Sequence, residues 1–216
     1  MPKSRTSRIL KVARKMHIYC EGLKTEPNYL RSYIDSLDNP KFKDIICVEK
    51  TNKNTPTQLV QEAVAAKNSG QFPDGDVYWV VYDRESSAKY SDHLHDQAFT
   101  KALDNGVNIA LTSVCFEQWL ILHFTDSQAP YSCFNDLIGK SCLKERIRSL
   151  TGKNYEKGSR DIFKYVKANI KDARRRAAAI NNQALRAAPP GRDKPYLLNP
   201  YSDIPKLLDA IDNFNS

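Results

Sequence analysis

The sequence has no long apolar segment, and this absence argues against two classes of protein. No stretch approaches the roughly 18 consecutive apolar residues that a membrane-spanning helix requires. The N-terminus is basic, but no apolar segment of the kind found in a secretory signal peptide follows it. We therefore expect a protein of the cytoplasm that has no membrane partner.

Cysteine pairs at metal-binding or redox spacing are also missing. The five cysteines are an odd set that contains no Cys-x-x-Cys motif, and three of them lie within or at the end of apolar runs. They are Cys20, Cys47, Cys115, Cys133 and Cys142. This usage is typical of reduced cysteines in an intracellular protein.

Several catalytic motifs are absent as well. The segment 22–25, Gly-Leu-Lys-Thr, lacks the spacing of a phosphate-binding loop, and there is no Gly-x-Ser-x-Gly motif. His93 and His95 have no third metal-ligating residue at suitable spacing, so we expect them on a helix surface. Trp119 is predicted to be a core residue of an apolar helix stripe, and His123 a partly buried residue with its hydrogen bonds satisfied. Catalysis by a serine or cysteine nucleophile is not expected.

The net charge of +8 is distributed unevenly along the chain. Residues 1–15 carry six basic and no acidic side chains, and residues 140–194 carry sixteen basic and five acidic ones. The rest of the chain is acidic, a layout expected where a cation-binding centre meets a polyanion. Nucleic acid, either RNA such as tRNA or DNA, is the natural candidate, and a solvated basic helix without a ligand is the alternative.

Short apolar segments alternate with amphipathic ones up to about residue 126. The apolar segments 17–20, 45–48, 77–82 and 107–114 have the length and composition of strands. Helical patterns between and after them begin near Thr25, Thr55, Asp92 and Phe116, with Thr25 and Thr55 as expected N-caps. This alternation predicts an α/β fold with a mainly parallel sheet flanked by helices.

The pattern changes after residue 126. Helical patterns rich in Lys and Arg cover 138–150 and 162–185, a turn or linker follows at 187–191, and a closing helix is expected at 204–214. We therefore predict a basic N-terminal arm (1–12), an α/β core (13–126) and a basic helical extension (127–216). The sequence does not define the oligomeric state, and a homo-oligomer is compatible with it.

Acidic residues follow two of the predicted strands. Glu21 follows the first strand, while Asp83 and Glu85 end the third and can share one face of it. Ligands bind at the carboxyl ends of strands in such sheets, and carboxylate oxygens suit Mg²⁺ or Mn²⁺. The three acids predict a metal site for phosphoryl transfer, although a solvated acidic loop is the simpler interpretation of Asp83 and Glu85 alone.

Three blocks of the sequence resemble the RloB-like family. They read CEGLKTEPNY at 20–29, VVYDRE at 80–85 and CFEQWLILHF at 115–124. That family is similar to the Toprim nucleases of phage-defence and abortive-infection systems, so the resemblance implies a Toprim-like catalytic core. It also implies that Glu21 is a metal ligand or general base, and that Asp83 and Glu85 hold magnesium. Relatives usually have Asp where this chain has Glu85, and Pro where it has Val114.

Two further residues are candidates for the same site. Glu117 opens a helix directly after the fourth strand, where it can face the other acids or simply favour the helix N-terminus. Lys24 lies in the loop after Glu21, where it can reach a phosphate or remain a surface lysine.

Basic residues at three- and four-residue spacings mark one face of the helical extension. With aromatic residues between them, they suit contacts with phosphates and bases of a nucleic acid. The candidates for nucleic-acid binding are Lys157, Arg160, Lys164, Lys167, Lys171, Arg174 and Arg175.

We expect a Mg²⁺-dependent nuclease that cleaves RNA or DNA phosphodiesters. The family resemblance implies a role in antiviral defence beside an ATPase partner. A nucleic-acid-binding module with vestigial acids and a regulatory subunit that acts only on its partner are the alternatives. Phosphatase-like and nucleotidyl-transfer reactions use similar acids.

Overall fold

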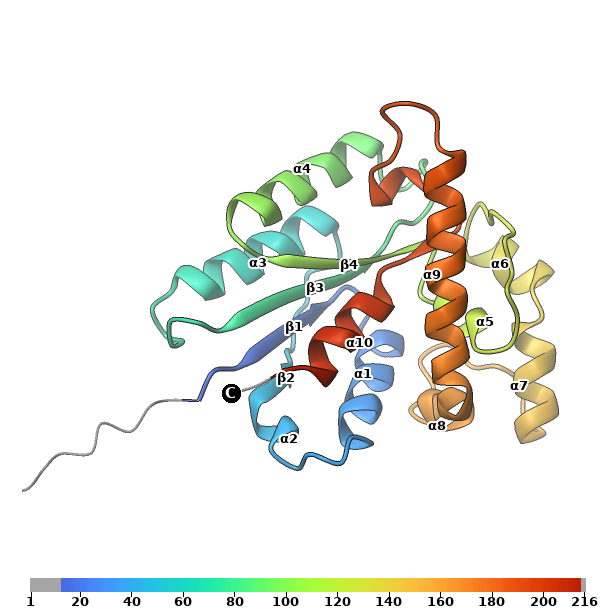
Figure 1. Ribbon diagram of the computed structural model, residues 1–216, viewed down its shortest axis with the longest axis horizontal. Helices are drawn as coiled ribbons and strands as arrows, with labels where there is room; N and C mark the ends of the chain where they lie inside the picture. Colours follow the sequence, from blue (N-terminus) through green and yellow to red (C-terminus); the bar gives the residue numbers. More distant parts are fainter. Residues whose placement is uncertain (1–12, 215–216) are drawn as a thin grey trace, which may run out of the picture.

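A five-stranded sheet forms the centre of the fold. The structure is a computed structural model that describes residues 13–214, so the predicted basic arm at 1–12 lies outside the described residues. The strand order is β2-β1-β3-β4-β5. The strands are β1 (Met16–Cys20), β2 (Ile46–Val48), β3 (Val77–Asp83), β4 (Asn108–Ser113) and β5 (Tyr201–Ser202). The first four are mutually parallel, and β5 runs antiparallel to β4 (Figure 1).

Helices α3 (Pro56–Asn68) and α4 (Asp92–Asp104) cover one face of the sheet. Tyr19, Val80 and Leu111 point from three strands into the core beneath these helices. The alternation of side chains along a strand then directs their neighbours, such as Val81, to the opposite face. A central strand buried on both faces needs apolar residues at nearly every position, which explains the continuous apolar run of β3.

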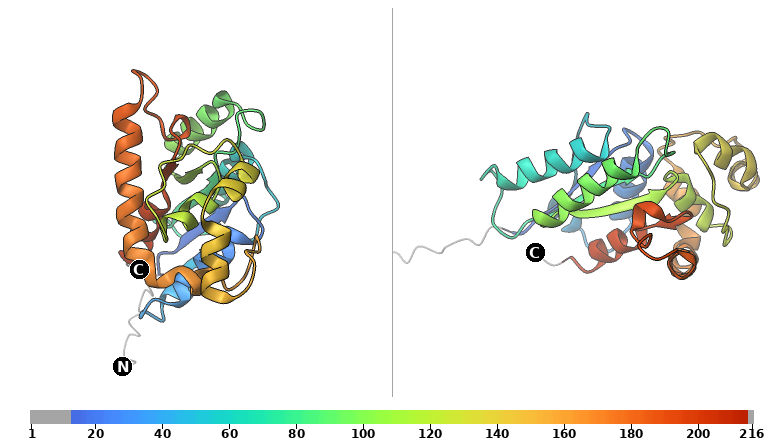
Figure 2. Two further views of the ribbon diagram at one scale, coloured as in Figure 1. Left: turned by 90° about the vertical axis from the view of Figure 1, so that its right-hand side faces the viewer. Right: turned by 90° about the horizontal axis from the view of Figure 1, so that it is seen from above.

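The opposite face is covered by α1 (Thr25–Asp35), α2 (Phe42–Ile45), α5 (Glu117–Leu122) and α10 (Ile204–Asp212). Seen from above, the helices lie on both sides of the sheet and form three layers (Figure 2). The prediction of an α/β fold with a mainly parallel sheet flanked by helices is confirmed.

Residues between β4 and β5 form α6 (Phe134–Lys140), α7 (Leu143–Thr151), α8 (Ile162–Val166) and α9 (Ile170–Ala187). The two long helices expected here are each divided. Ser141 is extended between α6 and α7, and its hydroxyl accepts a hydrogen bond from the Leu143 N–H at 3.3 Å. A 3₁₀ turn at Lys167–Asn169 separates α8 from α9, and a second one is formed by Pro195–Leu197.

The predicted boundary near residue 126 does not separate two hydrophobic cores. Strand β5 adds to the sheet beside β4, and Leu207 of α10 belongs to the same core cluster as Ile34 of α1 and Trp119 of α5. Sequence reasoning missed β5 because a two-residue strand has no recognisable period.

Of the two predicted helix N-caps, one is confirmed and the other is not. Thr55 occupies the N-cap position with extended backbone, and Pro56 is the first residue of α3, as expected. Thr25 instead lies within the first turn of α1, where Lys24 takes the N-cap position without a side-chain hydrogen bond. None of the helices between residues 13 and 214 combines the length and apolar composition that crossing a bilayer requires.

The shared core gives a test of how α10 contributes to stability. Leu207 is fully buried, so Leu207→Ala should lower the free energy of unfolding by about 2–5 kcal/mol, measured by urea denaturation. Leu150 is 59% exposed, and Leu150→Ala should change the same quantity by less than about 0.5 kcal/mol. Equal effects of the two substitutions would contradict a core that includes α10.

Candidate active site

An acidic cleft of about 470 Å³ opens at the carboxyl ends of β1 and β3. These ends point to the right in Figure 1, toward the helical part of the chain. Its walls include four carboxylates, those of Glu21, Glu26, Asp83 and Glu85. The strands place two of them directly, because Glu21 follows β1 and Asp83 ends β3, and the two strands are neighbours in the sheet.

Glu21 is held by the backbone and by a tyrosine. Its Oε2 accepts a hydrogen bond from the Asp83 N–H at 3.0 Å, and its Oε1 lies 3.1 Å from the Tyr90 hydroxyl. That hydroxyl is also 2.6 Å from the Asn54 carbonyl oxygen, so its one proton serves two acceptors. Burial raises the pKa of Glu21, and the hydrogen bond from Asp83 and the charge of Lys89 partly oppose this rise.

The Asp83 carboxyl group is enclosed by other acids. Its residue is only 8% exposed, and its carboxylate accepts no hydrogen bond from any group within residues 13–214. Burial raises the pKa of Asp83 well above its ordinary value, and the charges of Glu26, Glu21 and Glu117 raise it further. Such a carboxylate is favoured only beside a compensating positive charge.

Glu26 is a member of this site that sequence reasoning missed. It lies in the first turn of α1 and is 5% exposed. A Cβ at Gly22 would lie 2.0 Å from Glu26 Oε2, so glycine is required there for the carboxylate to approach the loop. Burial raises the pKa of Glu26 to about 7, with Glu117 and Glu21 contributing. Its position five residues after Glu21, at the start of a helix, was the available signal.

Glu117 lies beside the cleft at the first residue of α5 and is fully buried. Its Oε1 accepts a hydrogen bond from the Tyr155 hydroxyl at 2.7 Å. Its Oε2 is buried and has no hydrogen-bond partner among the described residues. An unpartnered buried carboxylate oxygen fits a cation ligand better than a mere helix-capping role, because capping leaves the group near solvent.

Glu85 differs from the other acids in its surroundings. It adopts a left-handed backbone conformation with φ of 56°, so β3 ends at Asp83 and does not persist through Arg84. The Glu85 carboxylate pairs with Lys89 Nζ at 2.6 Å. Asp83 and Glu85 therefore do not project from one face of a strand, although both line the cleft.

Arg84 faces away from the acids. Its guanidinium donates hydrogen bonds to the Tyr196 and Tyr90 carbonyl oxygens at 2.6 and 3.0 Å, and it pairs with Asp92 at 2.6 Å. These bonds tie the loop after β3 to the C-terminal segment, so the position of Asp83 depends on residues far along the chain.

Two lysines bring positive charge to the cleft. Lys24 lines its rim and is exposed, with its aliphatic part against Gly158. Lys157 also lines the cleft, and its Nζ lies 4.2 Å from the centre of the Phe134 ring. Although burial opposes the rise, the charges of Glu117 and Asp83 raise the pKa of Lys157. The loop that carries Lys157 is fixed by a 3.0 Å hydrogen bond from the Asn28 side chain to the Gly158 carbonyl.

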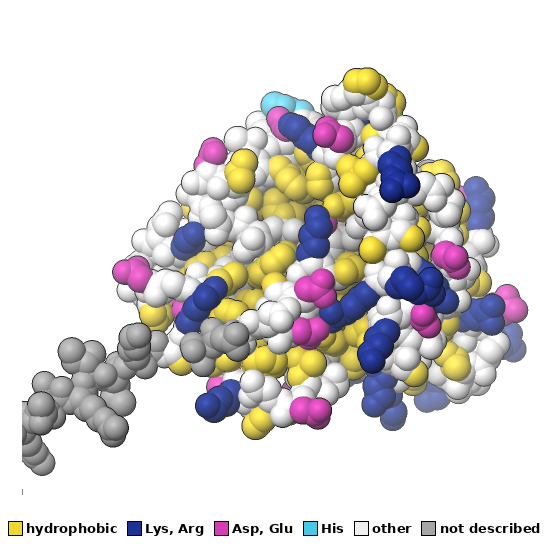
Figure 3. Space-filling model, in the orientation of Figure 1, with side chains coloured by type: hydrophobic (Ala, Val, Ile, Leu, Met, Phe, Trp, Pro, Cys, Tyr) yellow, Lys and Arg dark blue, Asp and Glu magenta, His cyan; other side chains and the backbone are white. Residues whose placement is uncertain are grey.

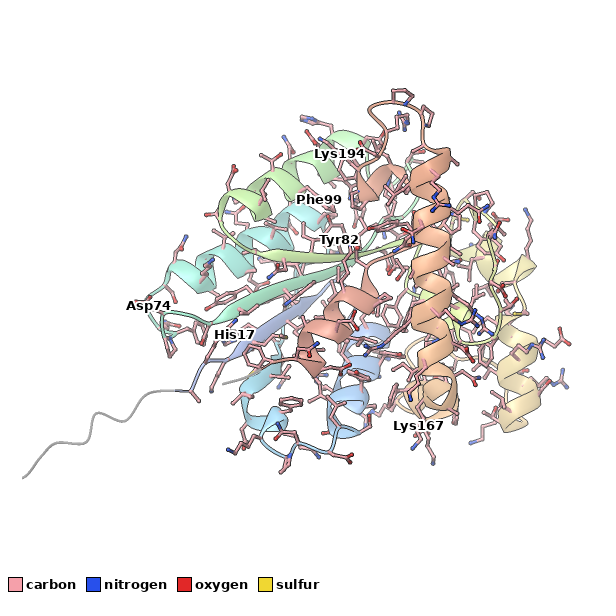
Figure 4. The ribbon with its side chains drawn as sticks, in the orientation of Figure 1. His17, Asp74, Tyr82, Phe99, Lys167 and Lys194 are labelled. Atoms are coloured by element: carbon pink, nitrogen blue, oxygen red, sulfur yellow. The ribbon has the colours of Figure 1, made fainter. Side chains whose placement is uncertain are left out.

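The remaining basic candidates lie on the helical part. Lys164, Lys167, Lys171 and Arg175 are exposed and form what we call the basic stripe along α8 and α9. Basic side chains gather over this part in Figure 3, and Figure 4 shows Lys167 at its lower end. Arg160 is exposed as well. Arg174 is engaged internally through Asp209 and Asp212, which makes it the least available of the predicted set.

The burial predictions for His123 and His95 have different outcomes. Trp119 is buried, as predicted, and His123 has the expected hydrogen-bond partners, Tyr29 and the Trp119 carbonyl, but is fully and not partly buried. The surface placement of His95 is wrong. It is fully buried, stacks between Tyr82 and Tyr196, and lies 3.0 Å from the Arg84 carbonyl oxygen. Helical spacing alone did not show which face of α4 meets the sheet.

The donor set of the cleft fits a hard divalent cation. The carboxylates of Glu21, Glu26, Asp83 and Glu117 supply only oxygen, which Mg²⁺ prefers. No three of them bring ligand oxygens within 4.8 Å of one another in the described part of the chain. The carboxylates would therefore turn toward a shared ion, which would offset their mutual repulsion.

The fold and site define the class: an α/β protein with an acid-lined cleft at the carboxyl ends of a mainly parallel sheet. Comparison with protein families matches residues 16–211 to the family described as RloB-like protein. The chain belongs to this family. No curated protein and no solved structure matches the chain.

The crowded carboxylates predict an inverse dependence of stability on pH. The pKa values of Glu26 and Asp83 are higher in the folded than in the unfolded chain, so the folded chain binds more protons and loses stability as pH rises. In EDTA, the crowded carboxylates should lower the free energy of unfolding by about 1–3 kcal/mol between about pH 5 and about pH 8. The lowered pKa values of the buried His95 and His123, about 4 each, add stability over part of the same range, so the contribution of the cleft is the difference in pH dependence between the wild type and Asp83→Asn. Urea denaturation at both pH values measures this change.

Asp83→Asn removes one of the like charges and should therefore reduce the loss of stability between about pH 5 and about pH 8. The exposed carboxylate of Asp104 provides the control, since Asp104→Asn should leave the pH dependence unchanged. The same pH dependence of stability in the wild type and in Asp83→Asn would refute the electrostatic description of the cleft.

Proposed function

We propose that this protein is a Mg²⁺- or Mn²⁺-dependent phosphodiesterase that cleaves RNA or DNA. The observation that carries the proposal is the buried Asp83 carboxylate, surrounded by Glu21, Glu26 and Glu117 at the carboxyl ends of parallel strands. Structural ion pairs would place cations against these acids, whereas Lys89 pairs with Glu85 and Lys157 Nζ lies over the Phe134 ring. Such a site suits a divalent ion and a phosphate group.

The chain's own residues have separate roles in this proposal. Asp83, Glu21, Glu26 and Glu117 would hold the cation, which when bound polarises the phosphodiester and activates a water molecule. Tyr155 and the Asp83 N–H orient two of these carboxylates. Glu26, whose pKa is about 7 in the metal-free cleft, would lose its proton when the cation binds.

Lys24 and Lys157 would bind the phosphate from the same part of the cleft, since the Lys24 side chain packs against Gly158, next to Lys157. Both line the cleft, and Lys24 Nζ is on an exposed side chain that can move toward a ligand. Glu85 pairs with Lys89, so its role in this proposal is to orient that lysine at the rim of the cleft. The basic stripe would bind further phosphates of the same strand.

Membership of the RloB-like family supports two extensions of the proposal. The first is a role in antiviral defence, through a Toprim-type cleavage of nucleic acid. The second is an ATPase partner that restrains or triggers the activity. Both rest on the family resemblance and are therefore less direct than the chemistry of the acidic cleft.

Asp83→Asn should abolish cleavage of labelled tRNA or DNA in Mg²⁺. The substitution retains the volume of the side chain but removes the central negative charge, so the rate should fall by about 10³-fold or more. Glu21→Gln should act similarly, whereas Glu85→Gln should have a smaller effect because Lys89 already neutralises that acid. Gel assays with Mg²⁺, Mn²⁺ and EDTA measure these rates.

Asp104→Asn, at an exposed acid on α4, serves as the matched control and should leave the rate unchanged. Circular dichroism would verify that each variant is folded. Wild-type protein that binds nucleic acid but does not cleave it in either metal would contradict the proposal and favour a binding module.

The basic stripe should determine affinity and not the rate of the chemical step. The combined variant Lys167→Glu and Lys171→Glu should weaken nucleic-acid binding and reduce the salt dependence of binding, with a slope smaller by about one per lost phosphate contact. Single-turnover cleavage at saturating protein should be unchanged. Fluorescence anisotropy at several salt concentrations measures the affinity.

Lys101→Glu, on α4 at the opposite helical layer, is the control for this charge reversal and should leave the affinity unchanged. Equal weakening by the control and by the stripe variant would show that only total charge matters.

A further inference from the structure

A second group of potential metal ligands lies outside the acidic cleft, at the start of β1 and β2. His17 of β1 stands directly beside Cys47 of β2 in the parallel register, and Glu49 follows β2. Figure 4 shows His17 near the amino ends of the strands, away from the end that carries Glu21 and Asp83. The proposed function uses none of these three residues.

The three side chains present one nitrogen, one sulfur and one oxygen to a common point. These ligand atoms lie within 4.8 Å of one another, and no other set of His, Cys and acidic residues within 13–214 does so. His17 is 1% exposed, whereas Cys47 and Glu49 are partly exposed and leave a path for an ion.

Asp76 provides the outer support that a metal-binding histidine usually has. The His17 Nε2–H donates to Asp76 Oδ2 at 2.9 Å, and this leaves Nδ1 as the nitrogen that faces Glu49 and Cys47. Asp76 is itself fixed by the Lys15 N–H, which donates to Oδ1 at 2.8 Å. The stacked ring of Tyr78, 4.9 Å away, further restricts the imidazole.

Distances in the group require only a small adjustment to hold an ion. His17 Nδ1 and Glu49 Oε1 are 2.7 Å apart, whereas two ligands of a tetrahedral Zn²⁺ at about 2.0 Å would be about 3.3 Å apart. The Glu49 side chain is 30% exposed and is free to withdraw by this difference. Cys47 and His17 are held by the sheet.

Two carboxylates flank the His17 ring, Glu49 at 2.7 Å and Asp76 at 2.9 Å. A divalent ion bound by the neutral imidazole and the Cys47 thiolate would be compensated by these negative charges, which offsets the cost of burying a cation.

We propose that His17, Cys47 and Glu49 form a zinc site, with Asp76 as the partner that orients His17. The ligand set of imidazole, thiolate and carboxylate selects Zn²⁺ over Mg²⁺, which prefers oxygen alone. Three protein ligands leave a fourth position for water. The site links β1 to β2 and would stabilise the edge of the sheet.

Cobalt titration of the full-length protein tests the zinc site, because a thiolate bound to Co²⁺ gives a charge-transfer band in the near ultraviolet. Wild-type protein should bind one equivalent with this band, and Zn²⁺ should displace it. Cys47→Ser should abolish the band, and Asp76→Asn should weaken zinc binding by about 10- to 100-fold. Binding should also raise the melting temperature of the wild type more than that of Cys47→Ser.

Matched controls separate this site from other cysteines and from the acidic cleft. Cys133→Ser changes another partly exposed cysteine and should leave the band intact, as should Asp83→Asn in the cleft. If Cys47→Ser does not fold, Glu49→Gln at the more exposed ligand provides the same comparison. A band that persists in Cys47→Ser, or wild-type protein that binds no equivalent of Co²⁺ or Zn²⁺, would overturn the proposal and leave a structural ion pair.

Discussion

Repulsion among carboxylates buried at the ends of adjacent strands is the constraint on which the acidic cleft depends. Asp83 and Glu26 lie where water can scarcely solvate them, so burial raises the pKa of both, and the charge of Glu26 raises that of Asp83 further. Specific contacts maintain this unfavourable arrangement: the Asp83 N–H holds Glu21, Tyr155 holds Glu117, and Gly22 leaves space for Glu26. A cation among these carboxylates would be attracted to each of them, so the same negative charges that destabilise the metal-free fold would bind the ion.

Residues after the parallel sheet complete the cleft. Tyr155 and Lys157 come from the loop before α8, and Asn28 of α1 binds that loop through the Gly158 carbonyl. Arg84 connects the other side of the cleft to Tyr196. The helical part therefore contributes more than a basic surface, because it also sets the position of residues in the cleft. This explains why one family match extends over both parts.

Much of the fold was predictable because its signals are local. Apolar segments of strand length, separated by amphipathic helices, indicated the parallel sheet and placed Glu21, Asp83 and Glu117 near one another. Glu26 was overlooked because a glutamate in a first helical turn is ordinarily solvated. The pairing of Glu85 with Lys89 followed from the left-handed conformation at Glu85, which no pattern in the residues indicates for a non-glycine position.

Strand and helix periods, charge distribution and the order of acidic residues were readable from the chain alone, since each depends on neighbours a few positions apart. Contacts between distant segments decided the rest. Strand β5 pairs with β4 across some ninety residues, and His17 meets Cys47 only because β1 and β2 are adjacent in register. Burial of Glu26 and Asp83 likewise depends on the packing of α1, α5 and the loop before α8 around them. This burial raises their pKa values.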